Sequence, residues 1–406
     1  MNHVVTKPTF KFALILATFS ALGPFTVDMY LSSLPKITDF FGTNASMVQA
    51  SLTASLLGLG LGPIVMGPLS DVHGRRNPLL ITMILYVLAS VGCAFAPNIE
   101  VFIALRFIQG FVASAGLVIS RAIVRDTYSG VEMTKFVSLL TMISNIAPLI
   151  SPVAGSTVTA YTSWIGVFIF LGILGIFLLV VTKWGVQETL PVEQRVSSNF
   201  LEILRNYKAL LKDRNFMGFA LVNGIMFAGV FAYVAGTPFI YQNIYGVSPM
   251  MFSILFALNG GAIMLGSQIV KLLAGRMTAQ RIFKVGLSLG FLSTGTVMTV
   301  VFSQGSLIAL VSSLFLFAVA IGIIGPVTFS LAMESQGHIA GSASAVLGIM
   351  PFLLGAFASP IVGIAGEYSA IPFGTLLFAT SLASIFAYFV LVKRSERAVY
   401  PETTHS

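Results

Sequence analysis

The chain has 406 residues, of which 22 are Lys or Arg and 14 are Asp or Glu, so charged residues make up only 9% of it. A globular soluble domain contains about 25% charged residues, and a chain with 56% hydrophobic residues would expose large apolar patches to water. This composition excludes a soluble protein. The net charge of +8 comes without basic clusters on a polar domain, which argues against a nucleic-acid binder. The single cysteine, Cys93, excludes an intramolecular disulfide and a thiolate metal cluster.

Apolar segments follow one another along the whole chain. A transmembrane helix needs about 20 apolar residues, and three longer runs without Asp, Glu, Lys or Arg each divide into two helices at a turn signal. The first run could be a signal peptide, but it continues to about Leu34 without a convincing cleavage site, so we interpret it as a span. The pattern predicts an all-α polytopic membrane protein with twelve transmembrane helices near residues 12–34, 47–69, 79–96, 99–120, 136–158, 165–182, 216–238, 250–270, 285–302, 306–333, 342–365 and 371–392.

The basic residues lie on one side of these helices. With the N-terminus placed in the cytoplasm, 20 of the 22 Lys and Arg residues fall on the cytoplasmic side. This is the distribution that the positive-inside rule describes. We therefore expect both termini to be cytoplasmic.

The longest polar stretch divides the chain into two sets of six helices. It predicts an N-terminal half at 1–184, a cytoplasmic linker at 185–213 and a C-terminal half at 214–406. The segment after the second helix, 67–76, is weakly similar to the segment after the eighth, 272–281. Two parallel six-helix halves with a substrate site between them are one design of a secondary transporter. Channels also contain repeats, so the similarity alone leaves both classes open.

Two charged residues lie well inside predicted helices, Asp28 in the first and Arg106 in the fourth. Their similar depths permit a direct or water-mediated pair. An ionisable group within a membrane costs at least about 2.5 kcal/mol, so a functional role is the default interpretation. A carboxyl in an apolar cavity can gain and lose a proton, which makes Asp28 the candidate proton carrier and Arg106 its partner. The alternative is a structural ion pair that joins two helices.

The most specific motif is the segment 67–76, which we expect to be a loop. Its glycines and Pro68 permit a tight turn, Asp71 can accept hydrogen bonds from a helix N-terminus, and the two arginines can pair with acids or lipid phosphates. In the fifth helix, two prolines four residues apart each remove a backbone donor, which predicts a bend. The candidate gating residues are Gly67, Asp71, Gly74, Arg75, Arg76, Pro148, Pro152 and Gly155.

Together these motifs resemble the major facilitator superfamily over nearly the whole chain. Segment 67–76 fits its Gly-x-Leu-x-Asp-x-x-Gly-Arg-Arg signature, and Arg106 with Gln109 and Gly110 looks like the fourth-helix motif of its drug exporters. Segment 148–155 looks like their fifth-helix motif, with Ala147 where a glycine is usual. Segments 28–35, 121–126, 236–239 and 338–345 are similar to the bicyclomycin and chloramphenicol resistance (Bcr/CflA) subfamily.

That subfamily exports antibiotics in exchange for protons. The resemblance implies the major facilitator fold, with Asp28 as the proton-coupling acid, Arg106 as its partner and Asp71 in contact with the eleventh helix. Some related exporters carry a second acid where this chain has Ser20, which weakens the case for export of dications.

Other classes of protein fit less well. The four histidines lie at termini or in loops, so a membrane-embedded enzyme lacks its catalytic groups. The Gly-x-x-x-x-Gly-Lys-Ser/Thr loop of an ATP-driven pump does not occur. We therefore expect no metal and no cofactor, and a proton gradient as the energy source. The main alternative to drug efflux is proton-coupled uptake or export of one specific metabolite.

The predicted function is proton-coupled efflux of antibiotics or other largely apolar small molecules across the bacterial plasma membrane. Abundant Phe and Met favour a soft, apolar cavity. Its candidate polar residues are Tyr30, Asn145, Asn223, Tyr233 and Asn259. The expected partners are the drug, protons and membrane lipid but no nucleic acid, and the expected state is a monomer.

Overall fold

The computed structural model describes residues 10–195, 200–334, 336 and 339–392. Within these residues the chain is almost wholly helical, and twelve helices are long and apolar enough to cross a membrane, so the predicted number of spans is confirmed. The helices are α1 (Phe10–Asp28), α2 (Leu34–Phe41), α3 (Ala45–His73), α4 (Arg76–Ala94), α5 (Ile99–Thr127), α6 (Gly130–Tyr161), α7 (Trp164–Gly185), α8 (Phe200–Lys212), α9 (Arg214–Phe239), α10 (Pro249–Leu273), α11 (Ala279–Phe302), α12 (Leu307–Met333), α13 (Ala340–Val362) and α14 (Ile371–Ala387).

The first span is two helices in succession. It runs from Leu14 to Phe41, beyond the predicted end at residue 34, and α1 stops within it at Asp28. A short 3-10 turn, Leu31–Ser33, leads into α2, which carries Pro35 in its first turn. Proline is tolerated there because the first amide groups of a helix have no intrahelical acceptor. The consequence for function is that Asp28 is the last residue of a helix that ends inside the span.

Packing divides the chain into two compact units, which are described separately. Unit 1 contains the described residues up to Tyr30 and from Leu57 to 195, and unit 2 contains residues 31–56 and the described residues from 200 onward. By packing, residues 31–56 therefore group with the C-terminal helices. Their side chains donate hydrogen bonds to main-chain carbonyl groups of α13 and α9: Ser46 to Pro360 (2.9 Å), Thr53 to Ala356 (3.1 Å) and Gln49 to Ala235 (3.1 Å).

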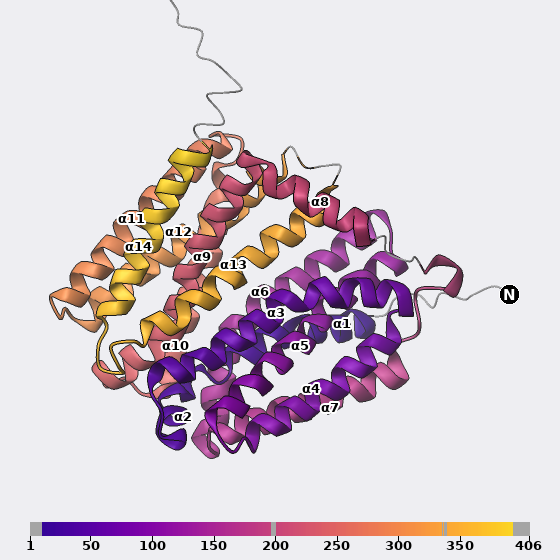
Figure 1. Cartoon of the computed structure of the whole chain (residues 1–406), viewed down its shortest axis with the longest axis horizontal. Coiled ribbons are helices and arrows are strands. Elements are labelled where there is room, and N and C mark those ends of the chain that lie inside the picture. Colours follow the sequence, from indigo (N-terminus) through magenta and orange to yellow (C-terminus); the bar gives the residue numbers. More distant parts are fainter. Residues whose placement is uncertain (1–9, 196–199, 335, 337–338, 393–406) are drawn as a thin grey trace, which may run out of the picture. The chain divides into compact units, whose positions relative to one another are not determined.

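In unit 1, α1 packs against α5 and α6, and α4 packs against α5 and α7 (Figure 1). At Gly155, α6 passes directly over the backbone of Met29, because a Cβ atom at Gly155 would overlap the Met29 carbonyl oxygen. The predicted gating residue Gly155 is therefore required by a close helix crossing next to Asp28. In unit 2, α9 packs against α12, α13 and α14, and α12 packs against α10 and α11.

Segment 67–76 is not the loop that its sequence predicts. The helix α3 continues through Gly67, Pro68 and Asp71 to His73, and α4 begins at Arg76, so only Gly74 and Arg75 form the turn. Gly74 has a φ angle of +87°, a left-handed conformation that favours glycine. Local composition misled the prediction because one glycine and one proline are tolerated within a membrane helix.

Two further elements concern the linker and the fifth span. In the predicted polar linker lies the helix α8, whose apolar residues recur at helical spacing. The fifth span lies in α6, a single helix from Gly130 to Tyr161 that contains both Pro148 and Pro152, and the bend predicted at these prolines stays a prediction. The termini, whose cytoplasmic location was predicted, lie outside the described residues.

Candidate functional site

Asp28 lies buried in unit 1, with only 8% of its surface exposed. Its carboxyl group is next to the Ser151 side chain of α6, whose buried hydroxyl makes no hydrogen bond to a described residue, and it is close enough to Arg106 to interact with its charge. Asp28 occurs where α1 ends, so the neighbouring chain turns away from the helix axis. The Asp28 carboxyl therefore lies inside the membrane span, next to residues of α5 and α6.

Arg106 on α5 is fully buried, but it does not pair directly with Asp28. Its guanidinium donates to the main-chain carbonyl of Thr26 (2.9 Å) and to the Gln109 side chain (2.5 Å), and it lies over the ring of Tyr30 at 4.2 Å. None of the ion pairs in the described part of the chain joins Arg106 to Asp28. The sequence permits a direct or a water-mediated pair, and the direct form does not occur in this structure, where the guanidinium binds a carbonyl and an amide and lies over an aromatic ring.

A hydrogen-bond network holds Arg106 in this position. Gln109 donates to the Ser90 hydroxyl (2.8 Å), and Ser90 donates to the main-chain carbonyl of Tyr86 (2.7 Å). The Tyr86 hydroxyl in turn shares a hydrogen bond of 2.8 Å with the Thr26 hydroxyl. The network therefore closes through α5, α4 and α1 back to the residue that binds Arg106. Sequence reasoning missed Tyr86 and Ser90, although polar residues four apart in an apolar helix are the signal of a shared polar face.

The predicted gating residues of segment 67–76 surround the Arg75 side chain, which is almost fully buried in unit 1. It donates to Asp126 at the end of α5 (2.7 Å), to Asp71 (2.5 Å) and to the Ser70 hydroxyl (2.8 Å). Burial alone would lower the pKa of Arg75, but these bonds to two carboxylates outweigh it and raise the pKa above its ordinary value. Arg75 is therefore a permanent cation that holds α3 and α5 together.

Glu188, in the segment after α7, caps the first turn of α4. Its carboxylate accepts hydrogen bonds from the backbone amides of Arg75 (2.8 Å) and Arg76 (3.2 Å). These amides have no acceptor within the helix, and the partial positive charge there favours an anion. The Arg76 side chain donates to the main-chain carbonyl of Lys183 at the end of α7 (2.6 Å). Sequence reasoning did not single out Glu188, because 112 residues separate it from Arg76.

The candidate cavity residues are distributed between the two units. Tyr30 stacks with Arg106 in unit 1, where Asn145 is exposed on α6. In unit 2, the Asn259 amide donates to the Tyr233 hydroxyl (2.9 Å), and the Tyr233 ring stacks on Phe256. The side-chain oxygen of Asn223 is buried without a partner among the described residues. That these residues line one cavity stays a prediction.

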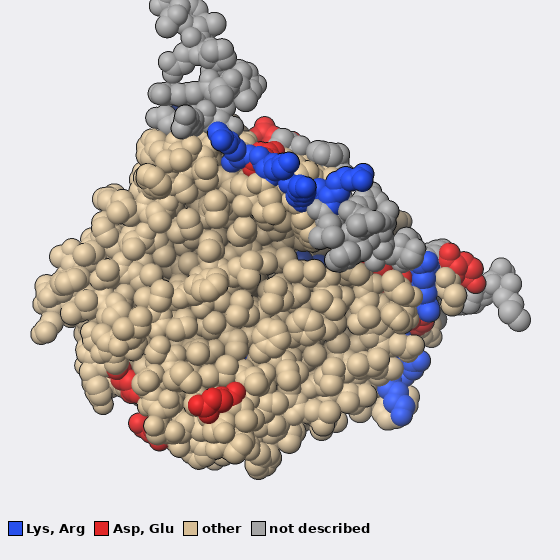
Figure 2. All heavy atoms as spheres, in the orientation of Figure 1, with Lys and Arg blue, Asp and Glu red and all other residues tan. Residues whose placement is uncertain are grey.

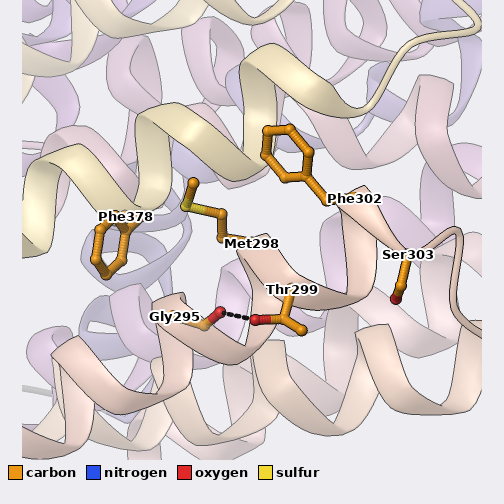
Figure 3. A pocket seen from close by; sticks show the side chains of 6 residues that line it. All are labelled: Gly295, Met298, Thr299, Phe302, Ser303 and Phe378. Carbon is orange, nitrogen blue, oxygen red and sulfur yellow. Dashed lines mark hydrogen bonds between the residues drawn. The ribbon is translucent and has the colours of Figure 1, made fainter.

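A groove of about 670 Å³ lies elsewhere, between α11 and α14 of unit 2. Figure 3 shows Met298, Phe302 and Phe378 around it, and the Thr299 hydroxyl donating to the Gly295 carbonyl within α11 (2.9 Å). None of the predicted site residues lines this groove, and none of its lining residues is ionisable. The described residues also contain no cluster of three or more His, Cys, Asp or Glu residues that could hold a metal ion.

Known proteins resemble the chain along most of its length. The sequence model described as the Major Facilitator Superfamily matches residues 14–360. An uncharacterized MFS-type transporter of Bacillus subtilis, YdgK, is 45% identical over 97% of this chain and 98% of its own. A bicyclomycin resistance protein homolog of Haemophilus influenzae is 28% identical over 96% and 98% of the two chains. A chloramphenicol resistance protein of Pseudomonas aeruginosa is 28% identical over 94% and 90%.

Solved structures share the fold at low sequence identity. A D-xylose-proton symporter superposes with a TM-score of 0.75 at 15% identity, covering 94% of this chain and 98% of its own. This similarity supports the arrangement of helices and carries no information about the substrate.

Proposed function

Because the chain belongs to the Major Facilitator Superfamily, and is therefore a multi-pass membrane transporter of small molecules and not an enzyme, we propose that it exports antibiotics or other largely apolar small molecules in exchange for protons. It acts as a monomer in the bacterial plasma membrane and uses the proton gradient without a cofactor. Relatives named for bicyclomycin and chloramphenicol resistance support export of such compounds.

The observation that carries the proposal is the position of Asp28. Every other Asp or Glu in the twelve spans lies within two residues of a span end, whereas Asp28 lies in the middle of the first span. A buried carboxyl that interacts with a hydroxyl and a nearby arginine is a group whose proton can be exchanged when its surroundings change. Asp28 therefore carries the coupled proton, and Arg106 adjusts how readily that proton is released.

In an exchange of drug for protons, the proton gradient sets the direction in which the drug moves. The outside is the proton-rich side in an energised bacterium, so a proton that loads on Asp28 from outside and leaves inward drives the drug outward. Arg106 is held by Thr26 and Gln109 in this structure, so a shift of α1 against α5 would change its distance to Asp28. A change in the distance between Arg106 and Asp28 during the transport cycle then couples proton release to drug movement.

Growth of a drug-sensitive bacterium that expresses the chain tests the function. Across an antibiotic panel, an exporter raises the tolerated concentration of at least one drug, and the increase disappears when an uncoupler abolishes the proton gradient. A chain that accelerates uptake of a nutrient and changes no drug tolerance is instead a metabolite importer, which would refute the proposal.

The Asp28→Asn variant tests proton coupling in proteoliposomes. We expect it to abolish uphill drug movement driven by a pH gradient while downhill drug exchange persists, because the amide still fills the site. Asp39→Asn is the matched control, since Asp39 lies in the same span but is exposed near its end. Uphill transport by the Asp28→Asn variant would assign the proton to another group.

The residues around Arg75 control the conformational cycle. Asp71 is half-exposed and pairs with Arg75 here, which leaves it accessible to a second partner when the units move. Asp71→Asn is therefore expected to slow transport while drug affinity stays nearly unchanged. Equal losses of transport and affinity would contradict this division.

The orientation is tested with reporter fusions. Fusions at Ser163, Gly246 and Gly305 are expected to report the outside, and a fusion at Asn199 the cytoplasm. A single reversed fusion would refute the orientation with cytoplasmic termini.

A further inference from the structure

The helix α8 of unit 2 has an amphipathic sequence that the transport mechanism does not use. It contains three basic residues and one acid, Glu202, which gives a net charge of +2. Arg205, Lys208 and Lys212 lie at spacings of three and four residues, so they fall within about 60° of the helix circumference and span roughly 10 Å along its axis. The basic residues therefore form one stripe along the helix.

The exposed fraction of the side chains increases around the circumference of α8, from Leu210 through Tyr207 to Leu211. Leu210 is fully buried where the helix packs against α9 and α13. Tyr207 is half-buried, and the next position around the helix, Leu211, is 59% exposed. The basic stripe follows directly after Leu211, and its three side chains are exposed. The helix thus presents an apolar edge and a basic edge side by side, as Figure 2 shows for the basic residues.

The start of α9 holds α8 at the boundary of the membrane. Asp213, between the two helices, accepts hydrogen bonds from the backbone amides of Asn215 (2.9 Å) and Phe216 (3.0 Å) and from the Gln336 side chain (2.6 Å). The span of α9 begins at Arg214, one residue later. The helix α8 therefore ends two residues before a membrane-spanning helix begins, so we expect its exposed edges to lie near the lipid headgroups.

We propose that this surface, formed by Arg205, Lys208, Leu211 and Lys212, binds the headgroups of anionic phospholipids. The Leu211 side chain enters the acyl region, and the three cations reach the phosphates from their long aliphatic stems. No residue whose side chain the structure describes forms an ion pair with these cations. The proposal concerns a lipid site outside the transport pathway and does not depend on which substrate is moved.

Two features favour lipid over a soluble anion or an acidic protein. A soluble phosphate gains nothing from the exposed Leu211, whereas an interfacial helix buries such a residue in the acyl region. The span of α9 starts beside the basic stripe, so bilayer lipid reaches it without a separate binding partner. Each cation near an anionic membrane surface strengthens binding by about fivefold.

Native mass spectrometry tests the proposal. The full-length protein in detergent is incubated with equimolar phosphatidylglycerol and phosphatidylcholine, and the bound lipids are counted. We expect the wild type to prefer phosphatidylglycerol, and R205Q/K208Q/K212Q to lower this preference by about a hundredfold. The single variant K212Q, which keeps two of the three cations, is expected to lower it by about fivefold. Unfolding midpoints close to that of the wild type establish that these variants are folded.

The matched control is K271Q/R276Q/R281Q, which removes three exposed cations of the same unit, one each from the end of α10, the turn after it and the start of α11. It is expected to keep the phosphatidylglycerol preference of the wild type. An unchanged preference in R205Q/K208Q/K212Q, or an equal loss in the control, would overturn the assignment to α8. Displacement of bound phosphatidylglycerol by millimolar inorganic phosphate would show a soluble-anion site and would also overturn it.

Discussion

The turn between α3 and α4 in unit 1 and the turn between α10 and α11 in unit 2 begin from nearly the same backbone. Gly74 and Gly275 have φ angles of +87° and +86°, and each is followed by an arginine. Arg75 is 1% exposed and bonded to two carboxylates, whereas Arg276 is exposed and in no ion pair with a described residue. The surroundings of Gly74 are filled by Glu188, and an added Cβ at Gly275 would meet nothing within 4 Å.

The comparison separates the backbone conformation that the turn requires from the acidic residues that the hydrogen-bond network around Arg75 requires. Both turns keep the glycine because both require a left-handed backbone. Among the described residues, only unit 1 has acids placed to receive the arginine and the amides of the following helix. A similar sequence therefore forms a tightly bonded charge cluster in one unit and a solvated turn in the other.

Replacing the arginine that follows each glycine is expected to produce the largest difference in stability between the two turns. Arg75→Gln leaves the Asp126 and Asp71 carboxylates without their buried cation, and we expect it to destabilise the protein by about 3 kcal/mol. Arg276→Gln removes an exposed cation and is expected to change stability by less than about 0.5 kcal/mol. Thermal unfolding of the purified variants measures both. Equal shifts in the unfolding midpoint would mean that the network around Arg75 adds no stability.

Adding a methyl group to each glycine separates backbone strain from packing. Gly275→Ala is expected to cost about 1 kcal/mol from the left-handed backbone alone. Gly74→Ala is expected to cost about 2 kcal/mol, because the new Cβ overlaps the Glu188 carboxylate as well. Equal decreases in the unfolding midpoints of the two variants would mean that the Glu188 side chain moves away from the new Cβ without an energetic cost.

Truncating the two helix caps compares a charged cap with a neutral one. Glu188→Ala removes an acceptor for two amides and is expected to cost about 1.5 kcal/mol. Thr278→Ala removes a neutral cap whose bond to the Arg281 amide is 3.4 Å long, and is expected to cost about 0.5 kcal/mol. The unfolding midpoints of the two variants decide the order. A larger loss for Thr278→Ala would contradict the role assigned to Glu188.

The smallest effect on stability is expected from Glu367, an acid that forms no ion pair with a described residue. Glu367 in unit 2 accepts a hydrogen bond from Asn243 (2.9 Å), and burial together with the nearby Asp39 raises its pKa. A raised pKa means that the protonated form is favoured in the folded protein. Its contribution to stability is therefore present in acid and lost as pH rises through the folded-state pKa.

The wild type should thus lose stability relative to Glu367→Gln as pH rises from about 4 to about 8. The difference should stay below about 1 kcal/mol, because the site is partly exposed. Parallel pH profiles of the two proteins would show that Glu367 does not titrate in this range. No such pH dependence is expected from Arg75, whose raised pKa keeps it charged throughout.

Composition along the chain was sufficient to predict the twelve spans and the position of Asp28 within the first. The cost of placing a polar group in lipid depends on that group and its near neighbours, so it can be summed from local sequence. Helix ends were predicted less well. The helix α3 extends through a segment rich in turn-forming residues, and α1 stops at Asp28 although the apolar run continues.

Partners of the charged residues that lie far apart in the sequence were decided by the tertiary structure. Arg106 binds the Thr26 carbonyl and Gln109, not Asp28, and Glu188 caps a helix that begins 112 residues earlier. Hydrogen bonds and ion pairs need atoms within about 3 Å, and the packing of helices from distant segments sets those distances. The sequence by itself thus determined which residues enter the membrane and which carry charge there. Helix packing decided which of those charges meet.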